Sequence, residues 1–312
     1  MKVLLTSTSF QDCDGAHKEL LNQQGWEVHY LRGPLKKSEI IGEVANYDAL
    51  ICGDDEIDRE VLEKGAAGSL KFISKYGVGL DKIDLVAAKE LGIPVTNCPG
   101  VNQIAVAEHV LAMIFSFFKN IHLSHQITSQ GGWKRPLGNE LYGKKIGIIG
   151  LGAIGKELAR RTPFLGMETY VFDVHLDTDF TRANNLIALD SVEDIFNTCD
   201  IVSMHVPLQE STKGLISKKL LHETVKTGLV LVNTSRAGLV EEQDILDAIS
   251  NGKLGGYLTD VLAMEPMDGD CMLMNQPGIM ITPHISSRTK ETIQRQGSMA
   301  VRNLQKTISL YA

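Results

Sequence analysis

The chain has 312 residues, a length that suits about two globular domains. Hydrophobic residues make up 43% of the sequence and charged residues 22%, a balance that excludes a disordered chain. The formal net charge is −7, so the chain has no excess of the basic residues with which proteins bind nucleic acid or anionic lipid.

Neither a membrane span nor a signal peptide is predicted. The longest mostly apolar run, residues 104–118, is interrupted by polar residues and is too short to cross a bilayer. Gln11 and Asp12 end the apolar start of the chain too early for a signal peptide. The five cysteines are scattered, with no CxxC pair and no disulfide framework, which fits a reducing compartment. No metal site is expected. We therefore expect a cytoplasmic protein that binds neither membrane nor nucleic acid.

Short apolar runs alternate with helical patterns through the first hundred residues. Helical patterns cover residues 15–22 and 84–91, and the second ends at Gly92 with Pro94 close behind, a usual stop signal. This alternation predicts a parallel sheet covered by helices on both faces. The expected strands are residues 3–6, 28–30, 49–51, 71–74 and 95–97.

A second series of strands begins after Gly143. Continuous apolar runs such as residues 229–232 are typical of strands buried on both faces of a parallel sheet. The fold class is therefore α/β, with two doubly wound units of which the second is larger. The expected strands are residues 145–149, 169–172, 201–204, 229–233, 256–259 and 280–282.

The segments between and after these series set the expected domain boundaries. Residues 101–118 predict a helix that is apolar on nearly every face and buried where domains or subunits meet. Residues 120–142 show no clear period and are expected to form an irregular arm. Residues 289–304 are again helical and are expected to return to the first unit. The expected domains are residues 1–99 with 287–312 and residues 100–286.

The strongest local motif is a GxGxxG loop at residues 150–155, which follows a predicted strand and opens a predicted helix at residues 153–161. Gly150 allows the tight turn, Gly152 lets the backbone approach a pyrophosphate, and Gly155 lets helix and strand pack closely. Asp173 ends the next strand, where it would accept hydrogen bonds from ribose hydroxyls and repel a 2′-phosphate. NAD is therefore favoured over NADP.

This loop has two alternative interpretations. The glycines could form only a tight strand–helix turn, with Asp173 as a strand-end cap. The stretch also matches the GxxxxGK phosphate loop of ATPases, but Glu157 stands where that motif needs Ser or Thr to hold Mg²⁺. We reject the ATPase interpretation.

Arg236, Glu265 and His284 each come shortly after a predicted strand of the second series. Because ligands of parallel sheets bind beyond the carboxyl ends of strands, we expect these residues to converge with the nucleotide. Arg236 offers a planar fork for a carboxylate, His284 a proton for a carbonyl oxygen, and Glu265 would orient the imidazole. Together they suit hydride transfer on a 2-oxo acid. The alternative is an ordinary Arg236–Glu265 ion pair beside a hydrogen-bonded core histidine.

With these motifs the sequence resembles the D-isomer-specific 2-hydroxyacid dehydrogenase family, which includes D-3-phosphoglycerate and D-lactate dehydrogenases. The resemblance extends over about residues 3–305, and the matching stretches stand in the family's order. These stretches are residues 75–84, 106–109, 150–155, 205–208, 233–238, 259–261 with 265–266, and 282–284.

The resemblance implies an NAD-dependent enzyme that interconverts a 2-oxo acid and its D-2-hydroxy acid. It implies a flavodoxin-like substrate domain, a Rossmann NAD-binding domain with a cleft between the two, and a homodimer joined through the NAD-binding domain. The implied catalytic residues are Arg236, Glu265 and His284. The implied cofactor-binding residues are Gly150, Gly152, Ala153, Ile154, Gly155, Asp173, His205, Val206, Pro207, Thr212, Thr234, Ser235, Arg236, Asp260 and His284, with Asp260 at the nicotinamide carboxamide. The implied substrate-binding residues are Lys75, Tyr76, Gly77, Val78, Gly79, Asn102 and Arg236.

Departures from the family pattern leave three questions open. Lys75 stands where many phosphoglycerate-type members carry Arg, so it either grips a distal phosphate or carboxylate or is a strand-end lysine in solvent. Asn102 stands where formate-oxidising relatives use an Asn, but those have Gln in place of Glu265, and Asn102 could equally cap the helix that follows. No regulatory domain is expected after residue 312. Because the family includes corepressors, a non-catalytic NAD-sensing protein is the alternative function.

Overall fold

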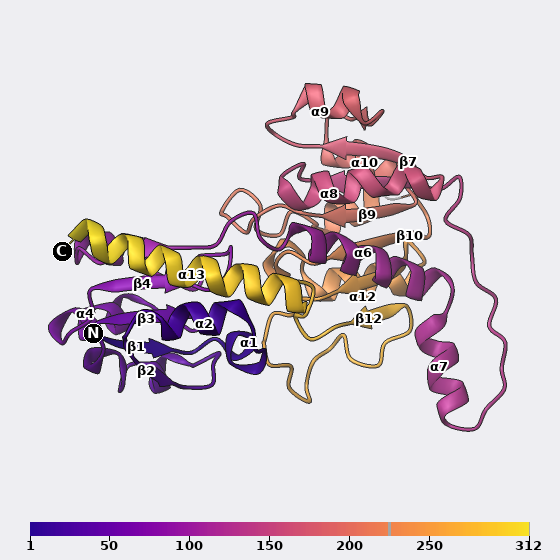
Figure 1. The fold of residues 1–312 in the computed structure, drawn as a ribbon. Helices are drawn as coiled ribbons and strands as arrows, with labels where there is room; N and C mark the ends of the chain where they lie inside the picture. The colour runs from indigo at the N-terminus through magenta and orange to yellow at the C-terminus, as the bar shows by residue number, and fades with distance from the viewer. Residues whose placement is uncertain (224–225, 312) are drawn as a thin grey trace. The chain divides into compact units, whose positions relative to one another are not determined.

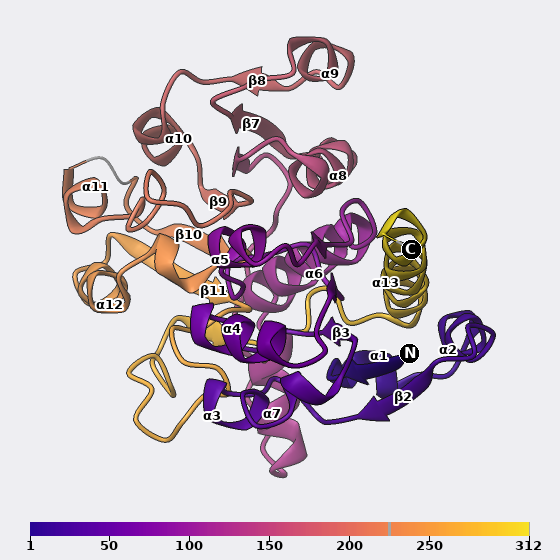
Figure 2. The same ribbon diagram turned by 90° about the vertical axis from the view of Figure 1, so that its left-hand side faces the viewer.

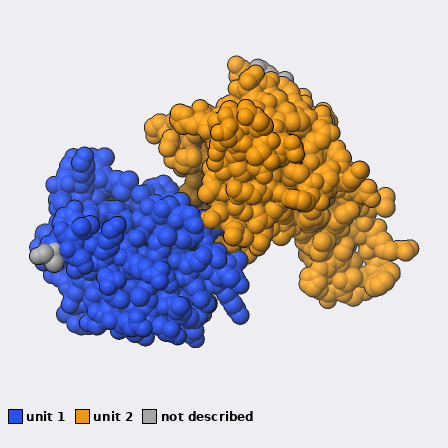
Figure 3. Space-filling model, turned by 45° about the horizontal axis from the view of Figure 1, so that its top comes forward, with its two compact units in different colours: residues 1–102, 288–312 blue, residues 103–287 orange. Residues whose placement is uncertain are grey.

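The computed structural model describes residues 1–223 and 226–311, which divide into two compact units (Figure 3). The first unit consists of Met1–Asn102 and Arg288–Ala312, and the second of Gln103–Ser287. Each unit contains one parallel sheet with helices on both faces, which confirms the predicted α/β fold class.

The first unit is built on a five-stranded parallel sheet. Its strands are β1 (Lys2–Leu5), β2 (Glu27–Tyr30), β3 (Ala49–Cys52), β4 (Phe72–Lys75) and β5 (Val95–Thr96). They lie in the order β2-β1-β3-β4-β5, and every pairing is parallel. All five predicted strands form, and their ends differ from the prediction by at most one residue.

Helices cover both faces of this first sheet (Figure 2). They are α1 (Thr8–Asp12), α2 (Ala16–Asn22), α3 (Lys37–Ile40), the 3₁₀ helix η1 (Val44–Asn46), α4 (Arg59–Ala67), α5 (Leu85–Glu90) and α13 (Lys290–Tyr311). Since side chains alternate along a strand, Leu4 and Leu50 share a core with α4 and α5, whereas Val3 and Ile51 share one with α2 and α13. The Ser74 hydroxyl donates a hydrogen bond to a carbonyl of α13 (2.8 Å). The C-terminal helix is thus part of the first unit.

The second unit is built on a seven-stranded parallel sheet. Its strands are β6 (Lys145–Ile149), β7 (Glu168–Phe172), β8 (Ile187–Ala188), β9 (Ile201–Met204), β10 (Leu229–Asn233), β11 (Leu254–Thr259) and β12 (Ile279–Ile281). They lie in the order β12-β11-β10-β9-β6-β7-β8. The ends of β6, β9 and β10 are those predicted, and the short edge strand β8 was not predicted. β10 is buried along its whole length, as its unbroken apolar run indicates.

Two groups of helices sandwich this second sheet (Figure 1). The helices of the unit are α6 (Gln103–Phe118), α7 (Ile121–Ser129), α8 (Ala153–Arg161), η2 (Thr162–Leu165), α9 (Thr178–Ala183), α10 (Val192–Thr198), α11 (Lys218–Glu223), η3 (Ala237–Leu239) and α12 (Glu242–Ser250). α6 and α8 share one core with the sheet, and α10, α11 and α12 share the other. α8 has the predicted bounds, and α6 begins two residues later than predicted.

The expected irregular arm at residues 120–142 is partly wrong, because its first half forms α7. None of the residues of α7 is buried, and Ile121 and Leu123 remain exposed. A helix without a buried face has no need for a regular apolar period, so the sequence carried no periodic signal for it. The segment from Gly132 to Leu141 has no helix or strand, as expected.

Within the described ranges, no single helix is long and apolar enough to cross a membrane. α6 and α7 together, bent by 64° where they meet, satisfy the same test of length and composition.

Candidate active site

Three neighbouring strands of the second unit end at the same edge of the sheet. β10, β11 and β12 are adjacent and parallel, and their last residues lie in register. Arg236, Asp260 and His284 follow these strands within a few residues. Since adjacent strands lie about 4.8 Å apart, the segments after β10 and β12 leave the sheet roughly 10 Å from each other. The topology therefore brings Arg236 and His284 to one edge of the sheet.

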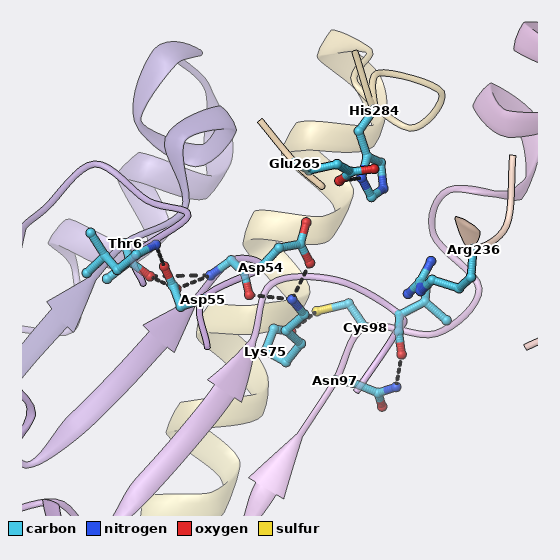
Figure 4. Close-up of polar contacts among 12 residues, drawn as sticks. Thr6, Asp54, Asp55, Lys75, Asn97, Cys98, Arg236, Glu265 and His284 are labelled. Carbon is cyan, nitrogen blue, oxygen red and sulfur yellow. Dashed lines mark hydrogen bonds and ion pairs between the residues drawn. The ribbon is translucent and has the colours of Figure 1, made fainter. Parts of the chain in front are cut away.

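Glu265 and His284 are in direct contact at this edge (Figure 4). Nδ1 of His284 lies 2.6 Å from Oε2 of Glu265, and Oε1 of Glu265 accepts a hydrogen bond from the backbone N–H of Leu262 (2.9 Å). Each side chain of the pair is 34% exposed, so His284 is not a core residue. Because an ionised carboxylate only accepts hydrogen bonds, Glu265 orients the imidazole with Nδ1 protonated. This contact engages Nδ1, so proton exchange with a ligand would have to occur at Nε2.

The turn that carries His284 is strained and is held by Asp260. The φ of His284 is 53°, in the left-handed region, which costs a non-glycine residue ~1–3 kcal/mol. Asp260 is fully buried, and its Oδ1 and Oδ2 accept hydrogen bonds from the backbone N–H groups of Ile285 (2.9 Å) and Ser286 (2.8 Å). Both oxygens thus engage this turn, and the contact of Asp260 with a nicotinamide carboxamide stays a prediction.

The segment after β10 is held by Asn233, a fully buried side chain that the sequence analysis did not single out. Its Nδ2 donates to the backbone carbonyl of Arg236 (2.9 Å), and its Oδ1 accepts from the N–H of Ser235 (3.0 Å). The Ser235 hydroxyl donates to the Met204 carbonyl (2.7 Å), and Arg236 Nη1 donates to the Ser235 carbonyl (2.7 Å). An amide that ends an otherwise apolar strand is the signal that could have identified Asn233.

The glycine loop between β6 and α8 has two crowded positions and one open position. Gly150 has a φ of 96°, and a Cβ there would lie 2.6 Å from the His205 carbonyl oxygen. A Cβ at Gly155 would lie 2.0 Å from the Gly150 carbonyl oxygen. A Cβ at Gly152 would meet no atom of the described chain within 4 Å. Ala153 and Ile154 begin α8 directly after this open position, where backbone N–H groups face outward from the helix start.

Asp173 follows β7 and reaches back to the glycine loop. Its Oδ2 accepts a hydrogen bond from the Leu151 N–H (2.6 Å), and its Oδ1 accepts one from the His175 N–H (2.8 Å). Each oxygen has a second lone pair that could accept from a ribose hydroxyl. The basic Lys156 near this loop is paired with Asp177 (2.6 Å) and lies over the Phe180 ring. The negative charge of Asp173 therefore opposes a 2′-phosphate, and the ammonium of Lys156 is already paired with Asp177.

Two buried polar atoms near this edge have no hydrogen-bond partner in the described part of the chain. They are Oγ1 of Thr234, after β10, and Nδ1 of His205, after β9. Nε2 of His205 contacts the Ser203 hydroxyl (2.9 Å), and burial lowers the pKa of His205 to about 4. Buried polar atoms normally have partners, so unpartnered ones at the edge of the sheet where the glycine loop opens fit a polar ligand. Together with Asp173, these residues fit a dinucleotide.

The loop after His205 closes on itself. The Thr212 hydroxyl donates to the Pro207 carbonyl (2.7 Å) and accepts from the Gln209 N–H (2.8 Å). Val206 is half-buried and lies at the start of this loop, against the position of Gly150. Val206 therefore lies beside the glycine loop, and Pro207 and Thr212 lie in the loop that follows β9. The contact of these residues with a cofactor stays a prediction.

Lys75, the last residue of β4 in the first unit, is buried. Its side chain is 2% exposed, and Nζ donates to Oδ1 of Asp54 (2.6 Å) and to the Gly53 carbonyl (Figure 4). The alternative of a strand-end lysine in solvent is therefore wrong. Burial by itself would lower the pKa of Lys75, but the charge of Asp54 outweighs it and the pKa is raised. The sequence could not show this, because Asp54 comes from the segment that follows the neighbouring strand β3.

The other predicted substrate residues also lie in the first unit, whereas Arg236, Glu265 and His284 lie in the second. Tyr76 is buried, which raises its pKa to about 12, and Gly77 has a φ of 155°. The Val78 side chain is exposed, and its carbonyl accepts a hydrogen bond from Asn97. Gly79 comes directly after Val78, and Asn102 directly precedes α6. Their roles toward a substrate stay predictions.

Comparison with known proteins identifies the family. The sequence profile described as "D-isomer specific 2-hydroxyacid dehydrogenase, NAD binding domain" matches residues 111–286, which is more than half of the chain. The chain belongs to this family. The predicted family and the predicted cofactor, NAD, are thereby confirmed.

Individual relatives carry several enzyme names. A D-3-phosphoglycerate dehydrogenase of Archaeoglobus fulgidus is 35% identical over 88% of this chain and 51% of its own length. A glyoxylate reductase of Thermofilum pendens is 34% identical over 87% of this chain and 81% of its own length. The chain spans about half the length of the first D-3-phosphoglycerate dehydrogenases that it matches, 51% and 47%.

Solved structures share the fold over almost the whole chain. A protein of Thermus thermophilus aligns with a TM-score of 0.86 and 33% identity, covering 99% of this chain and 97% of that one. The apo D-lactate dehydrogenase of Escherichia coli aligns with a TM-score of 0.88 and 26% identity over 99% and 97% of the two chains.

Proposed function

We propose that the chain is an NAD-dependent oxidoreductase that interconverts a 2-oxo acid and its D-2-hydroxy acid. The observation that carries this proposal is the 2.6 Å contact between His284 Nδ1 and Glu265 Oε2. An imidazole with a fixed carboxylate partner is the group that proton transfer to a substrate oxygen requires. Since all strands of the second sheet are parallel, the glycine loop after β6 opens at the same edge.

The proton is handled by His284. In reduction, Nε2 of the imidazolium would donate a proton to the carbonyl oxygen of the 2-oxo acid. In oxidation, Nε2 would accept the proton of the hydroxyl group, and the Glu265 carboxylate would stabilise the resulting imidazolium. NAD supplies the complementary chemistry when bound, since its nicotinamide carries the hydride that leaves or reaches C2. One proton and one hydride balance the conversion of C=O to CH–OH.

Arg236 would bind and polarise the substrate. A guanidinium offers paired N–H donors that match a carboxylate, and it stabilises negative charge that develops on a carbonyl oxygen. The backbone of Arg236 is extended, with φ −144° and ψ 141°, and Asn233 holds its carbonyl. A fixed backbone limits the positions of the guanidinium, which is what orientation of a small substrate needs.

Among small 2-oxo acids, phosphoglycerate-type substrates are one candidate class. The named relatives act on phosphoglycerate, glyoxylate and sulfolactate, so the family resemblance leaves the distal group of the substrate to be determined. A distal phosphate or carboxylate would have to compete with Asp54 for the ammonium group of Lys75. Comparison of phosphohydroxypyruvate with pyruvate as substrates tests whether it does.

We further propose a cytoplasmic homodimer joined through the second unit. Support comes from large apolar side chains that the second unit leaves exposed, with Trp133 84%, Leu137 94% and Phe164 91% exposed. Exposed apolar groups of this size are typical of association surfaces. Light scattering on the purified chain, with Trp133→Ser as the disrupting variant, measures the subunit number. A monomeric parent chain would contradict the proposal. We propose neither nucleic acid, membrane nor metal as a partner.

The enzymatic proposal is tested by following the loss of NADH absorbance with glyoxylate, hydroxypyruvate, pyruvate, phosphohydroxypyruvate and oxaloacetate. Turnover with at least one of these acids is expected, with a D-hydroxy acid as product. Tight NADH binding without turnover of any acid would instead favour the non-catalytic NAD-sensing alternative. His284→Ala is the matched control, since it removes the proton donor and leaves the glycine loop unchanged.

A further inference from the structure

A chain of hydrogen bonds links α6 to the turn that carries His284. Nε2 of His109, on α6, lies 3.0 Å from the Thr282 hydroxyl oxygen. That hydroxyl lies 2.5 Å from Oδ1 of Asp260, which also accepts from the Ile285 N–H (2.9 Å). His109 and Thr282 are 173 residues apart in the sequence, and they meet because α6 packs across the strands of the second sheet.

The direction of each hydrogen bond follows from the groups involved. Asp260 receives a backbone N–H on each oxygen, so both of its oxygens act as acceptors. Thr282 has one hydroxyl proton and must donate it to Asp260 Oδ1. The Thr282 oxygen can then only accept from His109, so Nε2 of His109 carries a proton. Burial lowers the pKa of His109, which favours the neutral ring with its single proton on Nε2.

The residues of this hydrogen-bond chain are shielded from solvent. Asp260 is fully buried and the His109 side chain is 18% exposed, so a lost hydrogen bond is not readily replaced by bulk water. This hydrogen-bond chain ends at the backbone N–H groups of Ile285 and Ser286, directly after the left-handed His284. His284 Nδ1 needs its 2.6 Å contact with Glu265. A shift of Asp260 would therefore move the imidazole.

We propose that His109 is a positioning residue, which acts through Thr282 and Asp260 to hold His284 in the orientation that proton transfer requires. The inference rests on the proposed function for the role of His284. The hydrogen-bond chain itself can be measured without turnover.

The first experiment determines the tautomer of His109 in the unmodified protein by NMR of ¹⁵N-labelled histidine, with His109→Gln used to assign its signals. We expect a neutral ring with the proton on Nε2 near pH 7. A proton on Nδ1 alone would overturn the inference, whatever the activity of the protein. If the unmodified protein turns over no 2-oxo acid while His109 carries its proton on Nε2, the proposed function fails and the hydrogen-bond chain stands.

The second experiment compares two matched pairs of variants in turnover. His109→Phe and Thr282→Val remove the hydrogen bonds, whereas His109→Gln and Thr282→Ser keep an N–H and a hydroxyl. Because a small misplacement of a reacting group lowers the rate up to about 100-fold, we expect kcat to fall roughly 10- to 100-fold in His109→Phe and in Thr282→Val. The KM for NADH should change little in all four variants. His109→Gln and Thr282→Ser should recover most of kcat.

Two results would overturn the inference here. One is a kcat of Thr282→Val equal to that of Thr282→Ser. The other is a loss of kcat matched by an equal loss of NADH affinity, which indicates general damage to the second unit. If His109→Phe does not fold, Thr282→Val and Thr282→Ser test the inference, together with the pH profile of their kcat. Misplacement of His284 should change that profile, whereas a general packing defect should not.

Discussion

Gly155→Ala tests the close contact between α8 and the glycine loop. Alanine normally stabilises a helix interior relative to glycine by about 1 kcal/mol, so helix propensity alone predicts a more stable protein. In the structure, however, the added Cβ would lie 2.0 Å from the Gly150 carbonyl oxygen, where ordinary contacts begin at 3.4 Å. The obstructing atom belongs to the backbone and cannot rotate away.

The magnitude follows from these two opposing terms. Overpacking typically costs about 1–3 kcal/mol, and a clash with backbone belongs at the upper end of that range. After the gain in helix propensity, we expect the free energy of unfolding to fall by about 2 kcal/mol. For a unit of this size that corresponds to a decrease in Tm of roughly 4–8 °C. Thermal denaturation by circular dichroism measures it.

Gly152→Ala is the matched control, because its Cβ would meet no atom of the described chain within 4 Å. We expect its Tm to fall by only a few degrees, since alanine is a slightly poorer N-cap than glycine. Its affinity for NADH should fall at least about tenfold, because the methyl group would stand where the diphosphate approaches. A Gly155→Ala protein as stable as the parent would refute the packing argument, and unchanged NADH affinity in Gly152→Ala would refute the role of the loop.

Four further predictions concern single side chains. His284→Ala should lower kcat at least about 100-fold with NADH affinity nearly unchanged, as measured by steady-state kinetics and fluorescence titration; undiminished kcat would contradict its role. Asp173→Ala should reduce the preference for NADH over NADPH, and a variant that rejects NADPH as strongly as the parent would contradict the ribose contact. Asp54→Asn leaves the buried ammonium of Lys75 without the carboxylate of Asp54. Because Asp54 is itself 59% exposed, the free energy of unfolding should fall by only about 1–2 kcal/mol. Urea denaturation measures this loss, and an unchanged stability would contradict the pairing. The pKa of His205 is about 4 in the folded protein and about 6.5 in the unfolded chain, so between these pH values only the unfolded state binds a proton at His205. The free energy of unfolding should therefore be unaffected by His205 above about pH 6.5 and should fall by up to about 3 kcal/mol as the pH approaches 4. His205→Gln should flatten this pH dependence.

The parts of the fold that were predicted most accurately are those with a single strong physical requirement. β6, β9 and β10 are buried on both faces along nearly their whole length, so each is a short and mostly apolar run. The bounds of α8 were predicted because the glycine loop marks its start and basic residues mark its end. α7 was missed for the opposite reason, since it has no buried residue and needs no apolar period.

The contacts of the candidate site were less predictable, because they depend on residues from different strands. Asp260 could be recognised as a strand-end carboxylate, but not as an acceptor for Thr282, Ile285 and Ser286. Lys75 could be recognised as a strand-end lysine, but not as the partner of Asp54, a carboxylate that follows β3. Strand order and register decide such pairings.

The sequence by itself determined the two α/β units, the dinucleotide loop and the family, because apolar periodicity and the GxGxxG spacing are local properties of the chain. Only the tertiary structure decided that His284 meets Glu265, that His109 reaches Thr282 and that Lys75 lies buried against Asp54. The physical reason is that these contacts arise where parallel strands end side by side. That arrangement depends on how the whole sheet packs, and no short segment of sequence records it.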